Sequence, residues 1–251
     1  MSPTIINLSA EAYSRKNDRA TVFNHFFDIL VQVGNLSAHI RDISDTKAPL
    51  DSLLAVMQEA LQLDMSLVSW ANSLSPAFSY TVIKNPCVYS EENDRYPYRS
   101  VYGESYHVYP NIRSAAIWNY YRLLRIVLHE MFRNIRLRLP KGVSRSKNKM
   151  VAFQIVEITK EMAEGICASV PYHFSLGEAV VGAVYRLLWP FYVVSDCAGS
   201  TSRMRKWILQ TLDKIGHTTG LRQALAMSQR LKEHNGLDWL TVELDKMTDR
   251  L

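Results

Sequence analysis

The sequence predicts an all-α protein, a single irregular helical domain over residues 1–251 with about six or seven helices and a long aromatic-rich loop in the middle. Through most of the chain, apolar residues recur at intervals of three and four positions, which is the spacing of one helix face. No segment combines sustained apolar–polar alternation with hairpin turns. The one strong hairpin dipeptide, Asn235-Gly236, is flanked by helical patterns.

The first two predicted helices cover residues 11–43 and 49–74. Pro49 suits the first turn of the second helix, and Ser75-Pro76 ends it, because the residue before a proline disfavours helical backbone. The apolar positions that we expect to face the core are Val22, Phe23, Phe26, Phe27, Leu30, Val33, Leu36 and Ile40 in the first helix and Leu50, Leu53, Leu54, Met57, Leu61, Val68 and Leu74 in the second.

The predicted loop covers residues 75–110, which are rich in Tyr, Asn, Pro and Ser and have no helical period. Loops of this length tend to be functional or to carry short strands. Its His and Tyr side chains can donate hydrogen bonds or act as acid or base, and Trp and Tyr line many small-molecule pockets. The alternative, and the commoner outcome, is that these rings only pack the loop against the core. The candidate ligand pocket comprises Tyr102, Tyr106, His107, Tyr109, Trp118 and Asn119.

A central helix is expected over residues 111–139, with two contrasting faces. The apolar face carries Ala116, Tyr120, Leu124, Val127, Leu128, Met131 and Ile135, and the opposite face carries Arg122, Arg125, His129, Arg133 and Arg136. Because like charges at this spacing repel, we expect Arg122 and Arg125 to pair with acidic side chains of the chain itself. The candidate partners are Glu157, Glu161 and Glu164. Arg133 and Arg136 would stay unpaired and form a surface for an acidic partner.

A basic block and further helices follow. Between Arg113 and Lys149 there are ten Lys and Arg residues and one acid, Glu130, so the block carries +9 in a chain of net charge +5. Such a block can attract nucleic acid or an acidic protein, or it can be a solvated helix face followed by a basic surface loop at 140–149. The remaining predicted helices are 150–170, 175–194 with a bend or cap at Pro190, 202–232 with a break near Gly216 or Gly220, and a short one from Asp238.

Several classes of protein are excluded by the composition. Cys87, Cys167 and Cys197 are odd in number and far apart, which indicates a reducing compartment. No signal peptide or apolar run of bilayer length occurs, so we expect a soluble intracellular protein, nuclear or cytoplasmic, with no membrane contact. There is no Cys-x-x-Cys, no His-x-x-x-His and no phosphate-binding Gly loop. We therefore assign no catalytic, metal-binding, cofactor-binding or DNA-binding residue.

Several short segments, in the same order, resemble the C-terminal part of the fungal-specific transcription-factor regulatory domain. They are Leu67-Val-Ser-Trp70 with Leu74-Ser-Pro76, Tyr106-His-Val-Tyr-Pro110 through Arg122, Glu164-Gly-Ile-Cys-Ala-Ser-Val-Pro171, Leu187-Leu-Trp-Pro-Phe-Tyr192, and Ile215-Gly216 through Arg222-Gln-Ala224. The resemblance implies an all-α regulatory domain that acts through an effector or a partner. In that family a zinc binuclear cluster that binds DNA precedes the domain, and its six cysteines are absent here. The N-terminal part of the family's domain also has no counterpart.

Three functions follow from these observations. The first is a transcription-factor-like regulatory protein without its own DNA-binding module, acting through a protein partner or small effector, in secondary metabolism. It would show no sequence-specific DNA binding by itself. The alternative is a biosynthetic enzyme, a cyclase or isomerase that uses a helical pocket with the Tyr/His loop. The third is a relative that retains only the fold. The first ranks above the enzyme because no catalytic constellation is visible.

Overall fold

A computed structural model describes residues 3–44, 49–84, 101–139, 145–177 and 180–233. Helices dominate these residues, which confirms the predicted all-α fold. The helices are α1 (Pro3–Ser44), α2 (Leu50–Ser73), α3 (Ile112–Arg138), α4 (Arg145–Phe174), α5 (Val180–Tyr185), α6 (Leu188–Asp196), α7 (Ser202–Thr219) and α8 (Arg222–Glu233). The helix predicted from Asp238 lies outside the described residues.

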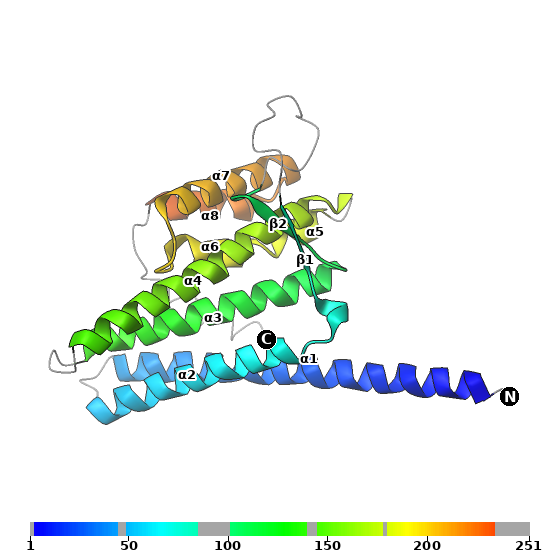
Figure 1. The fold of residues 1–251 in the computed structure, drawn as a ribbon. Helices are drawn as coiled ribbons and strands as arrows, with labels where there is room; N and C mark the ends of the chain where they lie inside the picture. Colours follow the sequence, from blue (N-terminus) through cyan, green and yellow to red (C-terminus); the bar gives the residue numbers. More distant parts are fainter. Residues whose placement is uncertain (1–2, 45–48, 85–100, 140–144, 178–179, 234–251) are drawn as a thin grey trace.

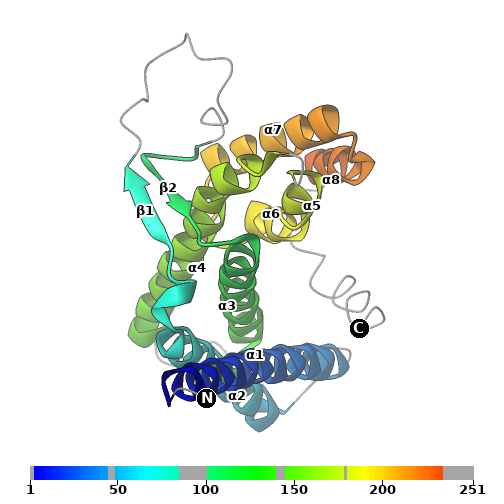
Figure 2. The same cartoon turned by 90° about the vertical axis from the view of Figure 1, so that its right-hand side faces the viewer.

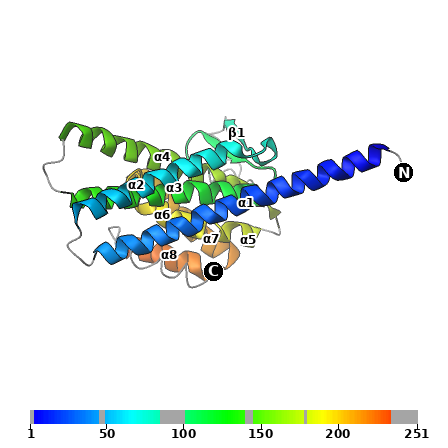
Figure 3. The same cartoon turned by 90° about the horizontal axis from the view of Figure 1, so that it is seen from below.

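Helix α3 lies at the centre of the bundle (Figures 1 and 2). It packs against α1 and α2 on one side and against α4 and α6 on the others, and α7 and α8 pair with each other beyond α6. The N-terminal part of α1 extends well past the other helices (Figure 3). The buried apolar residues of these helices form one continuous cluster.

The α1–α2 pair corrects part of the predicted core. Phe26 of α1 packs on Trp70 of α2, with ring centroids 4.5 Å apart. Phe27, Leu54 and Leu61, predicted to face the core, are 55%, 44% and 45% exposed. Helix α2 buries a set spaced alternately by three and four residues, which is the narrow seam of two packed helices. That set is Leu53, Val56, Ala60, Leu63, Leu67 and Trp70.

The prediction of an outward cationic face on α3 was wrong. Arg122 is 3% exposed, His129 is 7% exposed and Glu130 is fully buried, whereas Tyr120, predicted to be in the core, is 38% exposed. The helix is covered by neighbours on most sides, so its polar residues are enclosed together with its apolar ones. Asn111 caps its N-terminus, where the side-chain oxygen accepts from Ser114 N at 2.9 Å.

The predicted loop contains ordered elements that position the pocket. A short 3-10 helix, η1 (Pro76–Phe78), leads into β1 (Thr81–Lys84), which pairs antiparallel with β2 (Ser105–Val108). Thr81 lies opposite Val108 and Lys84 opposite Ser105. Strand β2 also lies against α4, on the side away from α1 and α2.

Several predicted helix boundaries also changed. The basic loop predicted at 140–149 is shorter, because α4 begins at Arg145; residues 140–144 are outside the described ranges. The predicted helix 175–194 is divided into α5 and α6, and Pro190 lies in the first turn of α6, where a missing N–H costs nothing. The predicted break near Gly220 is confirmed: Gly220 ends α7 with φ of +75°, which favours glycine.

Candidate ligand-binding site

A cavity of about 620 Å³ is lined by residues of the β-hairpin region, α3 and α4. Its walls combine aromatic rings, two arginines and an acidic rim, and this volume is in the range of ligand pockets. The lining residues are Tyr80, Tyr102, Gly103, Glu104, Ser105, His107, Trp118, Tyr121, Arg122, Arg125, Glu161, Met162, Glu164, Gly165 and Ala168.

The structure brings part of the predicted pocket together. Tyr102, His107 and Trp118 line the cavity. Tyr109 and Asn119 do not line it; instead they accept hydrogen bonds from Arg122. Tyr106 is half-buried and alternates with His107 along β2, so it belongs to the other face of the hairpin.

Arg122 is the centre of the site. Its NH1 atom donates to Tyr109 Oη at 2.9 Å and to Asn119 Oδ1 at 3.0 Å. The guanidinium lies 5.0 Å from the ring of Tyr80 and 5.8 Å from that of Trp118. Contrary to the sequence prediction, Arg122 forms no ion pair among the described residues. It is a buried cation with neutral partners, which fixes the hairpin to α3.

The hydrogen bonds around Arg122 determine the state of His107. Arg122 NH2 and Tyr109 Oη lie 3.4 Å and 3.2 Å from His107 Nδ1. Since a guanidinium can only donate, Nδ1 carries the lone pair and the proton is on Nε2. Burial and the Arg122 charge lower the pKa of His107 to about 3. Burial also raises the pKa of Tyr109, against the opposing effect of Arg122. Both side chains are therefore neutral near pH 7.

Gly165 of α4 makes room for this arginine. A Cβ atom at position 165 would lie 2.6 Å from Arg122 Nε and 3.0 Å from its Cδ. These separations are well below van der Waals contact, so any larger residue would displace the guanidinium. The close approach of α3 to α4 at the pocket depends on this glycine.

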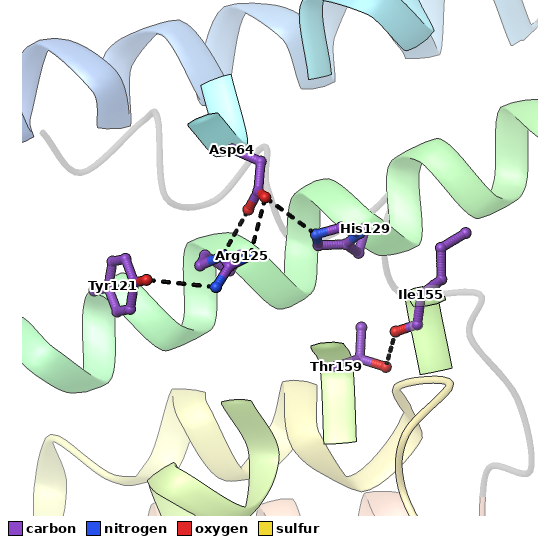
Figure 4. Close-up of polar contacts among 6 residues, drawn as sticks. All are labelled: Asp64, Tyr121, Arg125, His129, Ile155 and Thr159. Carbon is purple, nitrogen blue, oxygen red and sulfur yellow. Dashed lines mark hydrogen bonds and ion pairs between the residues drawn. The ribbon is translucent and has the colours of Figure 1, made fainter. Parts of the chain in front are cut away.

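A second polar cluster joins α2 to α3 beside the pocket (Figure 4). Asp64 Oδ1 accepts from Arg125 Nε at 2.7 Å, and Oδ2 accepts from NH2 at 3.0 Å. His129 Nε2 lies 3.4 Å from Oδ2. Burial alone would raise the pKa of Asp64, but His129 and Arg125 together lower it to about 2. Arg125 is thus paired internally as predicted, although with Asp64 rather than a glutamate of α4.

Arg133, predicted to belong to a surface for an acidic partner, is already paired with an acidic residue of the chain. Arg133 Nε donates to Glu130 Oε2 at 2.8 Å, and Glu130 Oε1 accepts from the backbone N–H of Ala198 at 2.6 Å. The expectation that Arg133 lies unpaired was wrong, because Glu130 is buried and needs a cationic partner. Arg136 is half-buried and also has interactions. We therefore do not assign this surface to a partner.

Other chemistry is sparse in the described residues. No cluster of three His, Cys, Asp or Glu side chains in them is placed to hold a metal ion. Cys167 and Cys197 are buried and free, and burial raises the pKa of both thiols. No helix in the described ranges has the length and apolar character needed to span a bilayer.

Comparison with protein-family models, with curated proteins and with solved structures gave no match. The function proposed below therefore rests on the site and on the resemblance seen in the sequence.

The residues that define the cavity most sharply were not predicted from the sequence. In the sequence, Tyr80 is not among the predicted pocket residues, Arg122 is expected to pair with an acidic side chain, and Gly165 appears only within a motif. One signal was available in the sequence: Asn119 and Arg122 fall on the same helical stripe as the apolar Ala115 and Ile126, at spacings of four, three and four. In the structure all four residues are buried.

Proposed function

We propose that this chain is a fungal transcription-factor-like regulatory domain, and that it responds to a small effector in the cavity between the hairpin, α3 and α4. The observation that carries the proposal is the aromatic cavity with the buried Arg122 at its inner wall. Aromatic rings combined with precisely held polar groups are typical of small-molecule sites. The resemblance to the fungal regulatory domain supplies the regulatory role.

The site favours binding over proton-transfer catalysis. A general base works best when its pKa is near the operating pH, and His107, with a pKa of about 3, is a poor base. Tyr109, with a raised pKa, is a poor acid. Both are held by Arg122, so their role is to shape and polarise the cavity. A cyclase or isomerase would need another acid–base pair.

The hairpin gives a route from the cavity to the surface. Ser105 and His107 contribute to the cavity wall, and Val108 on the same strand is 40% exposed. A ligand that contacts His107 would therefore bear on a strand that also carries the exposed Val108. A partner protein would detect effector binding through a change in this strand.

A reporter assay tests the proposal. The chain would be fused to an unrelated DNA-binding module, and transcription from the matching promoter would be measured in a fungal cell. We expect the fusion to change transcription relative to the module alone, and Ser105→Phe, which fills the cavity, to alter that output. Val108→Phe is the matched control, because it adds the same ring to the same strand outside the cavity.

Two results would contradict the regulatory role. One is a fusion whose transcription equals that of the module alone. The other is an equal effect of Ser105→Phe and Val108→Phe, which would show that the filled cavity is not what matters. Equal folded content of both variants, by circular dichroism, is required for the comparison.

A further inference from the structure

The charge of Arg122 is not balanced within the described residues. A guanidinium remains protonated at all physiological pH values, and this one is 3% exposed. Its neighbours are Tyr80, Tyr109, Asn119 and His107, which supply dipoles and ring faces but no negative charge. A buried charge without a counterion is unfavourable. An anion at this wall of the cavity would stabilise it.

The remaining charged side chains of the cavity do not neutralise Arg122. Glu161 and Glu164 line the cavity, but they are exposed and neither forms an ion pair with Arg122 in the part of the chain that the structure describes. Arg125, the second arginine of the cavity, already has Asp64 at 2.7 Å, so its own charge is balanced. The unbalanced charge is therefore at the inner wall, and the acidic groups are at the rim.

We propose that the effector is a flat aromatic monocarboxylate, bound with its carboxylate against Arg122 and its ring among Tyr80, Trp118 and Tyr121. This inference rests on the proposed function, because it identifies the chemical class of the effector. Arginine is the preferred partner of carboxylates. Because NH1 of Arg122 already donates to Tyr109 and Asn119, the carboxylate would meet NH2 through a single charge-assisted hydrogen bond. The rings of Tyr80 and Trp118 are 5.2 Å apart and those of Trp118 and Tyr121 are 5.5 Å apart. An aromatic ligand would extend this cluster.

The rim limits the ligand to one negative charge. Glu104, Glu161 and Glu164 are the exposed acidic residues of the cavity lining. A carboxylate bound to Arg122 lies away from these glutamates. A second carboxylate at the other end of a rigid ring system would lie near them. Like charges in this arrangement repel, although solvent and salt weaken the effect. The site thus selects a monoanion over a dianion built on the same ring system.

Three probes with the same ring system test the charge requirement: 2-naphthoate, neutral 2-naphthamide and 2,6-naphthalenedicarboxylate. Binding to the full chain would be measured by calorimetry and by quenching of tryptophan fluorescence. We expect 2-naphthoate to bind about tenfold or more tightly than either of the others, the range of one charge-assisted hydrogen-bonded contact. If 2-naphthamide or the dicarboxylate binds as tightly as 2-naphthoate, the inference is wrong.

Variants separate recognition from folding. Arg122→Gln should abolish the preference for 2-naphthoate over 2-naphthamide. Because Arg122 is buried and its loss can unfold the chain, Glu161→Gln with Glu164→Gln provides a second test on exposed positions. This pair should strengthen binding of 2-naphthoate about two- to fivefold, the effect of removing weak like-charge repulsion, and leave 2-naphthamide unchanged. Glu157→Gln, exposed on the same helix but outside the cavity, is the control and should change neither.

The outcomes distinguish this inference from the proposed function. Equal gains for 2-naphthoate and 2-naphthamide in the glutamine pair would overturn the charge argument. Failure of all three probes to bind, with a retained difference between Ser105→Phe and Val108→Phe in the reporter assay, would overturn the ligand class and leave the regulatory role standing. If Ser105→Phe and Val108→Phe have equal effects in the reporter assay but 2-naphthoate binds selectively, the regulatory role is overturned and the ligand class stands.

Discussion

Replacing Asp64 with asparagine tests how α2 is held against α3. The side chain keeps its shape but loses the charge that faces Arg125 and His129. Arg125 and Asp64 are 12% and 14% exposed, so solvent compensates little for the missing carboxylate. We expect a large loss of stability with little change in the fold.

The magnitude follows from the pKa of Asp64, which the contacts lower from 3.8 to about 2. One pKa unit corresponds to about 1.4 kcal/mol, so the ionised side chain stabilises the folded chain by about 2.5 kcal/mol. Because the folded-state pKa lies below the unfolded one, this stabilisation is complete above about pH 5 and is lost as the pH falls towards 2.

The assay is urea unfolding followed by tryptophan fluorescence, at pH 7 and at steps between pH 5 and pH 2. Asp64→Asn should lose about 2.5 kcal/mol at pH 7, and its stability should fall less steeply with acid than that of the wild type. Glu59→Gln, an exposed change on the same helix, should cost less than about 0.5 kcal/mol. A loss below about 0.5 kcal/mol for Asp64→Asn, or parallel pH profiles, would refute the reasoning.

Further predictions concern glycines and the buried glutamate. Gly199→Ala should destabilise by about 3 kcal/mol or more, since its Cβ would overlap the backbone nitrogen of Lys160; an unchanged melting temperature would contradict it. Gly182→Ala, with open space at its Cβ within α5, should instead stabilise by about 0.5–1 kcal/mol in the same thermal scan. Arg133→Glu should lower the melting temperature markedly, because buried Glu130 would lose its partner and meet a like charge.

The fold class and most element boundaries could be predicted because their causes are local. Helical periodicity, the cap at Asn111 and the left-handed Gly220 depend on residues a few positions apart. Some predictions failed because local sequence does not decide the outcome. Leu54 and Leu61 fit a helical stripe as well as Leu53 does, and only the packed partner selects which is buried. Similarly, the start of α4 at Arg145 lies in a basic segment that also suited a loop.

The site was predicted only in part, because its contacts join distant parts of the chain. Trp118 reaches the carbonyl of Phe78 across 40 residues, and Asn119 reaches Ser169 across 50. Tyr102, His107 and Trp118 could be selected from residue type alone, since aromatic and imidazole groups in or beside a long loop are typical of pocket linings. Arg122 could not, because an arginine on a helix is usually solvated.

The sequence by itself determined that this chain is helical and where most of its helices end, and it indicated an aromatic segment as the candidate for a pocket. Only the tertiary structure decided that α3 is enclosed by its neighbours, since a helix with one apolar stripe can be exposed or buried on the other side. That choice depends on whether distant residues supply partners. Here Asp64 supplies one for Arg125, Ala198 one for Glu130, and Tyr109 one for Arg122. These contacts lower the free-energy cost of burying each polar group, and Arg122 becomes part of the wall of a cavity.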